Sequence, residues 1–173
     1  MTPHIERMEA TPDRMRIGQR RALTAGEIAL GRMVFAEEID WRRVRVLQAP
    51  PLNFGAMVPL GRTIVFSKWR AHRDFADASL AEQGWFIHEL MHVWQAARGV
   101  TLAAAKLSAI GKHAYAYKPN PGVALKHYNI ERQAEIARHL FLARNSAHEP
   151  GMPEPAWLEA IWASRSKLRQ GVA

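Results

Sequence analysis

The chain has 173 residues, of which 48% are hydrophobic, and this length and apolar content predict one domain with a buried core. The sequence contains no cysteine, which excludes disulfide bonds and thiolate metal ligands, so any metal would have to be held by His, Asp or Glu. The formal net charge is +8, but the basic residues are scattered and no nucleic-acid motif accompanies them, so a nucleic-acid partner is not expected.

The beginning of the sequence lacks the features of a targeting segment. Residues 1–10 mix charged residues with proline and contain no apolar stretch of the roughly 7 to 15 residues that a signal peptide needs. No stretch of the sequence reads as long and apolar enough to span a membrane, so no transmembrane segment is expected. We therefore expect cytoplasmic synthesis without a signal peptide, and any export would use a non-classical secretion system.

Residues 1–22 are polar and rich in arginine, which predicts a lead-in arm ahead of a single domain at 23–173. The domain opens with a predicted helix over residues 24–39, because Thr24 and Glu27 have the spacing of a capping box. Apolar residues recur along this segment at the spacing of a helical face, which indicates that one side of the helix faces the core.

Two strands are predicted next, at 44–47 and 62–67, separated by a loop rich in Gly and Pro at 53–61. An edge strand beside a catalytic cleft can hold an extended peptide by backbone pairing. The candidates for such a substrate-binding edge are Thr63, Ile64, Val65 and Phe66. A strand that only closes the sheet is an equally good interpretation of the same residues.

The motif on which the functional prediction depends is His-Glu-x-x-His at residues 88–92, inside a predicted helix. Positions four apart lie on one face of a helix, so His88 and His92 can approach one ion while Glu89 lies beside them. Zinc accepts neutral imidazole nitrogen, and an adjacent carboxylate can serve as a general base, so the motif indicates a zinc hydrolase with Glu89 as its base. The alternative is a pair of hydrogen-bonded histidines on an ordinary helix.

After this helix, residues 101–110 read as an alanine-rich helical segment and 113–122 as a loop that could cross the mouth of a cleft. Two further helices are predicted over 128–143 and 155–168 from their apolar spacing. Helix is therefore expected to outweigh strand, in an α+β fold with a small sheet packed on the motif helix.

A hydrolytic zinc site needs three protein ligands, and no third His follows His92 at close spacing, so the third ligand is expected from a later helix. Glu131 and Glu135 lie along one edge of the helix over 128–143. The run from Glu131 to Glu135 resembles the Glu-x-x-Ala-Asp element of glutamate-zincins (gluzincins). That resemblance implies that Glu131 binds the metal and Glu135 supports a ligand, although Glu135 replaces the usual Asp. An exchange of the two roles stays open, with His139 as a further alternative.

Over most of its length, from Thr24 through the motif helix to Glu131, the chain resembles small zincin-like proteins described as Vgr-related and associated with type VI secretion. The resemblance implies a minimal zincin-like domain that binds one Zn²⁺ per chain. It also implies a metallopeptidase that acts on a peptide or protein substrate, with a secretion-apparatus partner. The alternative is a non-catalytic zincin-like protein that serves binding or assembly at a type VI secretion spike. A basic binding module with an incidental His pair is a third interpretation.

Catalysis of this kind also benefits from a donor that stabilises the negative charge that develops on the substrate oxygen. The residues between the motif helix and Glu131 are the natural source, because the chain must bring this region near the metal if Glu131 is a ligand. The candidates are His113, Tyr115, Tyr117, His127 and Tyr128. Packing of these side chains without a catalytic role is an equally good interpretation.

Overall fold

A computed structural model describes residues 13–52, 55–59, 61–102, 120 and 122–165. The strands in these residues are β1 (Arg20–Ala22), β2 (Arg45–Gln48), β3 (Ala56–Met57) and β4 (Thr63–Phe66). The α-helices are α1 (Ala25–Phe35), α2 (Leu80–Ala97), α4 (Ile130–Arg144) and α5 (Pro155–Ala163), joined by the short 3-10 helices η1 (Trp41–Arg43), η2 (Phe75–Asp77) and η3 (Leu125–His127). Helix outweighs strand in this part of the chain, so the predicted α+β class is confirmed.

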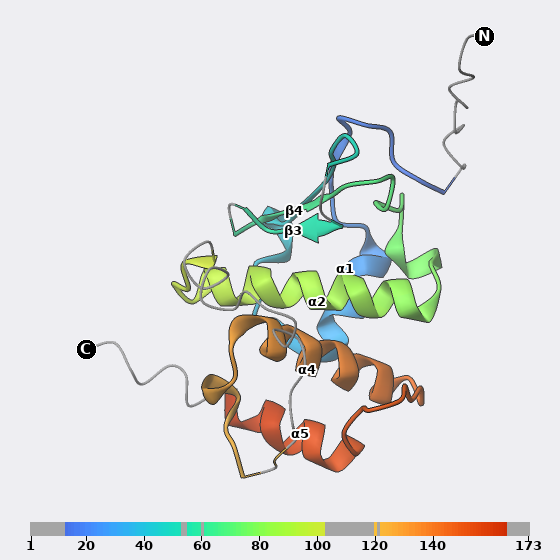
Figure 1. The fold of residues 1–173 in the computed structure, drawn as a ribbon. Coiled ribbons are helices and arrows are strands. Elements are labelled where there is room, and N and C mark those ends of the chain that lie inside the picture. The colour runs from blue at the N-terminus through green and yellow to red at the C-terminus, as the bar shows by residue number, and fades with distance from the viewer. Residues whose placement is uncertain (1–12, 53–54, 60, 103–119, 121, 166–173) are drawn as a thin grey trace, which may run out of the picture.

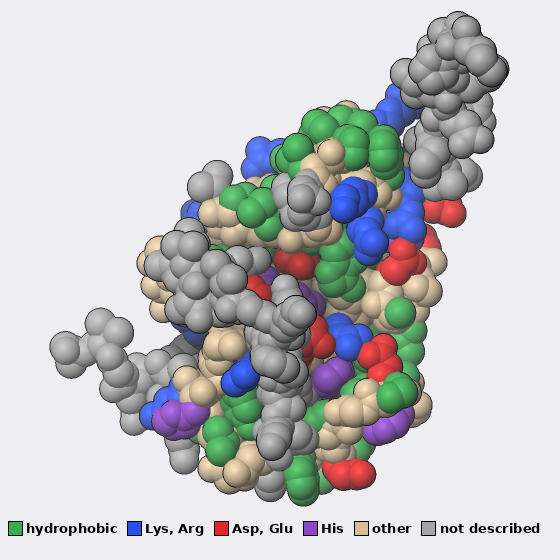
Figure 2. Space-filling view, viewed as in Figure 1, with side chains coloured by type: hydrophobic (Ala, Val, Ile, Leu, Met, Phe, Trp, Pro, Cys, Tyr) green, Lys and Arg blue, Asp and Glu red, His purple; other side chains and the backbone are tan. Residues whose placement is uncertain are grey.

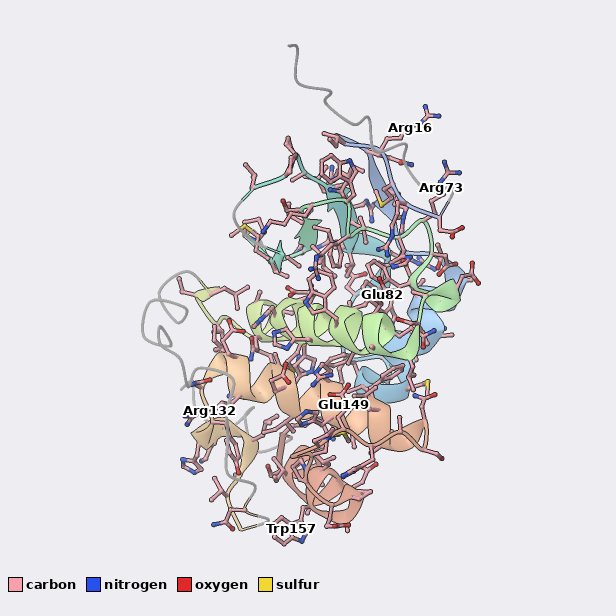
Figure 3. The ribbon with its side chains drawn as sticks, turned by 45° about the vertical axis from the view of Figure 1, so that its right-hand side comes forward. Arg16, Arg73, Glu82, Arg132, Glu149 and Trp157 are labelled. Atoms are coloured by element: carbon pink, nitrogen blue, oxygen red, sulfur yellow. The ribbon has the colours of Figure 1, made fainter. Side chains whose placement is uncertain are left out.

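The elements form layers around α2. The sheet lies on one side of α2, and α4 and then α5 lie on the other side (Figure 1). Helix α1 packs against both α2 and α4. The side-chain view shows Arg16 and Arg73 at the sheet end of the molecule and Trp157 of α5 at the opposite end (Figure 3). Helix α2, which carries the His-Glu-x-x-His motif, is therefore the central element of the described fold.

Aromatic contacts join the sheet to α2. The ring of Phe66 in β4 lies 4.9 Å from that of Phe75 in η2, which stacks on Phe86 of α2 at 4.7 Å between ring centroids. All three side chains are fully buried. Such ring pairs add about 0.5 to 1.5 kcal/mol each beyond the burial of apolar area, so this stack fixes the sheet against the motif helix.

The sheet confirms both predicted strands and adds two that were not predicted. Its order is β1-β2-β4-β3, with β2 and β4 parallel and both outer strands antiparallel to their neighbours. The outer strands are too short to leave a periodic pattern, and β3 lies within the segment predicted as a Gly- and Pro-rich loop. The predicted substrate-binding edge at Thr63–Phe66 is contradicted at Val65 and Phe66, which pair with both β2 and β3, whereas Thr63 and Ile64 pair only with β2 in the register of the described strands.

The predicted lead-in arm over residues 1–22 has to be shortened, since its residues from 13 onward pack on the domain. Met15 is fully buried, Arg14 forms an isolated β-bridge with His72, and β1 pairs with β2. Residues 1–12 of the predicted arm lie outside the described residues. A polar composition alone could not reveal that this segment contributes one buried side chain and an outer strand.

The helix predictions hold, with shifted ends. Thr24 caps α1 through the predicted capping box, but α1 ends at Phe35 rather than 39, because Ala36 takes a positive φ of 48°. Helix α4 begins two residues later and ends one residue later than the predicted 128–143, and α5 begins at the predicted residue 155 and ends at Ala163. Most of the helix predicted at 101–110 and of the loop predicted at 113–122 lies outside the described residues. Among the residues described, no helix is both long and apolar enough to cross a membrane.

A buried ion pair ties β1 to the start of α1. Both guanidinium Nη atoms of Arg21 donate to the carboxylate of Glu27, at 2.6 and 2.7 Å, and the Glu27 side chain is fully buried. The same carboxylate accepts hydrogen bonds from the backbone nitrogens of Thr24 and Phe75. One acid therefore holds a strand, a helix start and η2 together.

Replacing Glu27 with Gln should lower the free energy of unfolding by about 3 kcal/mol, because the substitution leaves the largely buried Arg21 without its counter-charge. Chemical denaturation followed by circular dichroism would measure the change. Glu37→Gln is the matched control, since Glu37 forms an exposed ion pair with Arg32 and should change stability by less than about 1 kcal/mol. Equal effects of the two substitutions would contradict this account of the buried pair.

Candidate metal centre

Helix α2 presents the three residues of the motif from its buried middle. Ser79 caps the helix by accepting a hydrogen bond from the Glu82 nitrogen, and the chain turns away after the helix at Gly99, with φ of 84°. His88, Glu89 and His92 are exposed by 5%, 4% and 0%, respectively. The two imidazole rings lie 5.1 Å apart between centroids. The helical geometry predicted for the motif is therefore present in a water-poor setting.

Helix α4 brings the third candidate ligand to these histidines. Asn129 caps α4 by accepting a hydrogen bond from the Arg132 nitrogen, so Glu131 falls in the first helical turn. Its Oε2 lies 3.3 Å from Nε2 of His88 and 3.4 Å from Nε2 of His92. One ligand atom from each of the three residues lies within 4.8 Å of the others, which is the arrangement of a metal-ligating set.

Glu135 takes a different position, on the far side of the His88 ring. Its Oε1 lies 2.8 Å from Nδ1 of His88, and its Oε2 accepts a hydrogen bond from Nε of Arg138 at 3.1 Å. Arg138 in turn binds both carboxylate oxygens of Glu149. The geometry therefore favours Glu131 as the ligand and Glu135 as the supporting acid. His139 contacts Glu135 at 3.7 Å and does not belong to the convergent set.

The second histidine is oriented by a neutral amide. Nε2 of Gln95 donates to the backbone oxygen of Ile130 and to Oε1 of Gln133, each at 3.0 Å, so Oε1 of Gln95 faces Nδ1 of His92 at 2.9 Å. Because Gln95 presents only an acceptor there, Nδ1 of His92 must carry the proton. Nε2 of His92 then keeps its lone pair for the space that it shares with Glu131.

The sequence analysis missed these supporting residues. Gln95 follows His92 by three positions, which places it on the same helical face, and Gln133 lies between the two predicted acids of α4. The spacing of Gln95 from His92 was the available signal, but glutamine is so common on helices that this spacing is not specific. The ion pairs of Arg138 depend on tertiary packing and left no pattern in the sequence.

The carboxylate of Glu89 is buried beside this cluster. Its Oε2 has no hydrogen-bond partner among the described residues, although the side chain is almost fully enclosed. A buried acceptor without a partner costs free energy, so it is retained where a bound species or a reaction uses it. Two imidazole nitrogens, one carboxylate and an adjacent free carboxylate oxygen form a donor set that fits a zinc ion and its general base.

The charges of the cluster shift the pKa values of its members. Burial by itself lowers the pKa of His88, but its contacts with Glu131 and Glu135 and the charge of Glu89 outweigh burial and raise the pKa to about 9. Burial raises the pKa of Glu135, whereas His88 and Arg138 lower it more strongly, to about 2. Burial and the charge of Arg138 lower the pKa of His139 to about 4.

The cluster forms the floor of a cavity of about 380 Å³. Acidic and His side chains are visible inside this hollow, between the sheet layer and the helices beyond it (Figure 2). The helical lining consists of Trp85 and the five residues His88, Glu89, His92, Glu131 and Glu135. The sheet side contributes Gly55, Ala56, Lys68 and Arg70. The residues of the cluster are thus accessible from a space large enough for part of a peptide.

Of the five predicted transition-state donors, the two that the structure describes are not brought together with the cluster. His113, Tyr115 and Tyr117 lie outside the described residues. His127 is exposed in η3, Tyr128 is buried where η3 ends, and neither is among the described residues that line the cavity. The role of these five residues in catalysis stays a prediction.

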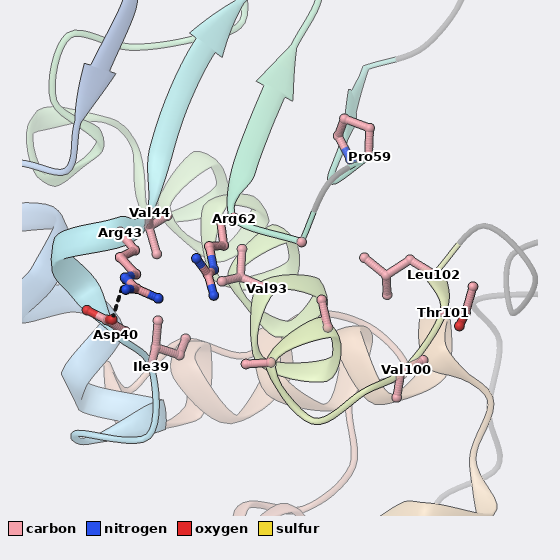
Figure 4. A pocket seen from close by; sticks show the side chains of 13 residues that line it. Ile39, Asp40, Arg43, Val44, Pro59, Arg62, Val93, Val100, Thr101 and Leu102 are labelled. Carbon is pink, nitrogen blue, oxygen red and sulfur yellow. Dashed lines mark ion pairs between the residues drawn. The ribbon is translucent and has the colours of Figure 1, made fainter.

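A second cavity, of about 630 Å³, lies toward the C-terminal end of α2 (Figure 4). Its lining is mostly apolar, and its charged members are Asp40, Arg43 and Arg62, of which Arg43 pairs with Asp40 at 3.4 Å. The described lining includes neither His nor Glu. Although this cavity is larger, its one carboxylate, Asp40, is paired with Arg43 and its described lining holds no metal-ligating set, so the smaller cavity is the candidate site.

The comparisons with known proteins point to type VI secretion. No family model matches the sequence. The chain is 37% identical over 139 residues to the type VI secretion system spike protein VgrG2b of Pseudomonas aeruginosa, over 75% of this chain and 14% of that protein. The chain therefore spans a small part of the length of this relative. The solved effector domain of P. aeruginosa VgrG2b resembles the structure with a TM-score of 0.64 and 34% identity, covering 83% of this chain and 82% of that domain.

In protein kept free of metal by a chelator, the raised pKa of His88 should make stability depend on pH. The folded-state pKa of about 9 lies above the ordinary value of 6.5, so the stabilisation is complete below pH 6.5 and is lost as the pH rises through 9. Glu135→Gln removes one partner of His88, so the free energy of unfolding should fall less over this interval. Urea denaturation across the interval and an NMR titration of His88 would measure both effects. Glu159→Gln, which removes an exposed pair with Arg144, should leave the titration unchanged, and an unchanged titration in Glu135→Gln would refute the assignment.

Proposed function

We propose, since the chain belongs to the same family as the effector domain of VgrG2b, that it is a zinc-dependent metallopeptidase associated with type VI secretion. The observation that carries this proposal is the convergence of Nε2 of His88, Nε2 of His92 and Oε2 of Glu131 in one buried place. Glu89 lies beside them with a buried carboxylate oxygen that has no hydrogen-bond partner among the described residues.

His88, His92 and Glu131 would hold the zinc, and their supporting contacts suit that task. Gln95 keeps the proton of His92 on Nδ1, and Glu135 does the same for His88 by accepting from its Nδ1, so both Nε2 atoms are directed to the same side. When bound, zinc would supply Lewis acidity that activates water and polarises a substrate carbonyl. Glu131 would contribute a carboxylate oxygen as the third protein ligand.

Glu89 is the proposed general base. It follows His88 directly on α2, so its carboxylate is held next to the ligands while its Oε2 has no competing partner among the described residues. In the proposed reaction Glu89 accepts a proton from the attacking water and returns it to the leaving amine of the substrate. Burial of Glu89 and of the two histidines limits the access of other water to these groups.

The edge of the sheet beside the cavity gives a place for an extended peptide. Strand β3 is the terminal strand of the described sheet, and Ala56 of β3 lines the cavity. Backbone groups on an outer strand can pair with an added strand, so β3 takes over the role that the sequence analysis gave to Thr63–Phe66. A peptide on β3 would pass along the wall opposite His88 and Glu131, in line with a protein or peptide substrate.

The relation to a spike protein also supports the secretion setting of the proposal. VgrG2b is named as a type VI secretion system spike protein, and the similar solved structure is named as its effector domain. We propose that this chain likewise acts as an effector with a partner in the secretion apparatus. The alternative is a zincin-like domain that serves only assembly with the spike. Such a domain would not require the carboxylate of Glu89.

Replacing a ligand should abolish zinc binding. Purified wild-type protein is expected to hold about one zinc per chain, whereas His92→Ala and Glu131→Gln should hold almost none, because two remaining ligands bind zinc weakly. Glu135→Gln should keep zinc with an affinity lower by about 10- to 100-fold, as expected when a supporting contact is lost. Metal analysis and competition with a chromogenic chelator would measure this. If Glu131→Gln kept its full zinc content and Glu135→Gln lost its zinc, Glu135 would be the ligand and Glu131 the supporting acid.

Glu89→Gln should separate an enzyme from an assembly protein. The substitution keeps the side-chain size and both histidines, so zinc should stay bound while turnover of a peptide substrate falls by at least about 100-fold. Cleavage of an unfolded protein substrate, followed by mass spectrometry of the fragments, would detect the change. Glu82→Gln, on the same helix outside the cavity lining, is the matched control and should retain activity. Zinc-loaded wild-type protein that cleaves no substrate would favour the assembly function.

A further inference from the structure

A basic turn forms the wall of the cavity opposite the carboxylates. It consists of Ser67-Lys68-Trp69-Arg70 and follows β4 directly. Lys68 and Arg70 both line the cavity, while the helical lining supplies Glu89, Glu131 and Glu135. The site thus has an acidic floor from the helices and a basic wall from the sheet side.

The backbone of this turn has an uncommon conformation. Lys68 and Trp69 both have φ of 53°, and the Arg70 nitrogen donates to the Ser67 oxygen at 3.1 Å to close the turn. Two consecutive residues other than Gly in this region cost about 1 to 2 kcal/mol each, and such strain is concentrated at functional sites. The surrounding structure therefore has to hold the turn in place.

Hydrogen bonds of the buried Ser67 hold the turn in this conformation. Ser67 is fully buried, and its hydroxyl donates to the Pro50 oxygen at 2.8 Å and accepts from the Leu52 nitrogen at 2.7 Å. The Ser67 nitrogen donates to the oxygen of Gly55, next to β3. Ser67 thus fixes the turn to the neighbouring loop, so that the backbone of the wall is placed by hydrogen bonds rather than left free.

The two cations of the turn have no carboxylate partner in the part of the chain that the structure describes. The guanidinium of Arg70 lies 5.3 Å from the ring centre of Trp85, which lies edge-on to Phe66 at 5.0 Å. Neither Lys68 nor Arg70 forms an ion pair with any described residue, and both side chains are exposed. Their charges are therefore available to a molecule in the cavity.

Two of the three acids on the floor already have partners on the helices. Glu135 already contacts His88 and pairs with Arg138, and Glu131 lies against both histidines. Without the basic wall, the three carboxylates of the floor would repel an anionic ligand. The basic wall allows a negatively charged group to bind on the sheet side of the cavity, while the His and Glu cluster stays accessible on the helix side.

We propose that Lys68 and Arg70 select substrates that carry a carboxylate next to the scissile bond. This inference rests on the proposed peptidase function and names the substrate class of the same site. Two sources share this chemistry, an Asp or Glu side chain within the peptide and the carboxylate at a peptide C-terminus. A carboxylate can bind Arg in a forked geometry and Lys as a point charge, and both donors are on the same wall.

The experiment compares the zinc-loaded full chain with its Lys68→Glu and Arg70→Glu variants. A peptide library is first digested by the wild type, and the cleaved sites define matched peptides that carry Glu or Gln beside the scissile bond, each with a free or an amidated C-terminus. Arg16→Glu is the control, since it changes the charge equally and Arg16 projects at the sheet end outside this cavity (Figure 3). Thermal unfolding tests whether each variant is folded. If the Glu variants do not fold, Lys68→Gln and Arg70→Gln are used in their place.

The expected result is a kcat/KM for the carboxylate-bearing peptide at least about tenfold above that of its neutral match, a ratio consistent with one close charge pair in a partly solvated site. This ratio should fall toward one in both cavity variants and stay unchanged in Arg16→Glu. Dependence on the Glu residue assigns the carboxylate to a side chain, and dependence on the free C-terminus assigns it to the chain end. A ratio near one in the wild type, or a ratio that the cavity variants leave unchanged, overturns the inference.

A binding measurement keeps the inference separate from the proposed function. The affinity of Glu89→Gln for the same matched peptides is measured by calorimetry, with and without Lys68→Gln in the same chain. Cleavage without carboxylate preference overturns the inference and leaves the peptidase intact. Absence of cleavage, with preferential carboxylate binding that depends on Lys68, overturns the peptidase and retains the recognition role of the turn. Absence of both cleavage and binding overturns the two proposals together.

Discussion

The packing of α4 on α2 is the contact on which the candidate site depends, because each helix supplies only part of the ligand set. Its register is fixed by buried polar groups. Gln95 of α2 reaches the backbone oxygen of Ile130 and the side chain of Gln133, and Gln133 donates to the backbone oxygen of Tyr128. A shift of α4 by one turn, about 5.4 Å, would leave these buried groups unpaired and would also remove Glu131 from the histidines. The same hydrogen bonds therefore specify the fold and assemble the site.

The two histidines of the motif are supported in unequal ways, and this inequality follows from the helix register. His88 meets the carboxylate of Glu135, whereas His92 meets the neutral amide of Gln95. The carboxylate contacts and nearby charges raise the pKa of His88 to about 9 against the effect of burial. A proton on His88 is therefore retained to a higher pH than on an ordinary imidazole. The chain of ion pairs from Glu135 through Arg138 to Glu149 extends this influence to the loop after α4.

Sequence reasoning was most successful where a local pattern carries the information. The apolar spacing of the helical segments, the cap at Thr24 and the β-rich segments predicted the four α-helices and the two inner strands of the described fold, since each pattern depends on neighbours within one element. The outer strands and the burial of Met15 depend on pairing and packing between distant segments, which short polar sequences do not reveal. For the site, the resemblance to gluzincins gave Glu131 and Glu135 before their geometry was known. Gln95 and the basic turn were missed because their roles arise only when the layers come together.

The site is placed by two separate parts of the core, and each part controls a different half of the chemistry. On the sheet side, Phe66 packs against both Phe75 and Trp85, so the position of the sheet on α2 sets where the turn with Lys68 and Arg70 meets the cavity. On the other side, α5 supports α4, and Trp162 packs against Trp94 of α2 at 6.1 Å between ring centroids. Loss of packing at α5 would first loosen α4 and with it Glu131, whereas loss at the aromatic stack would first displace the basic wall. Because α2 is common to both parts, His88 and His92 are the members of the site least able to move independently of the fold.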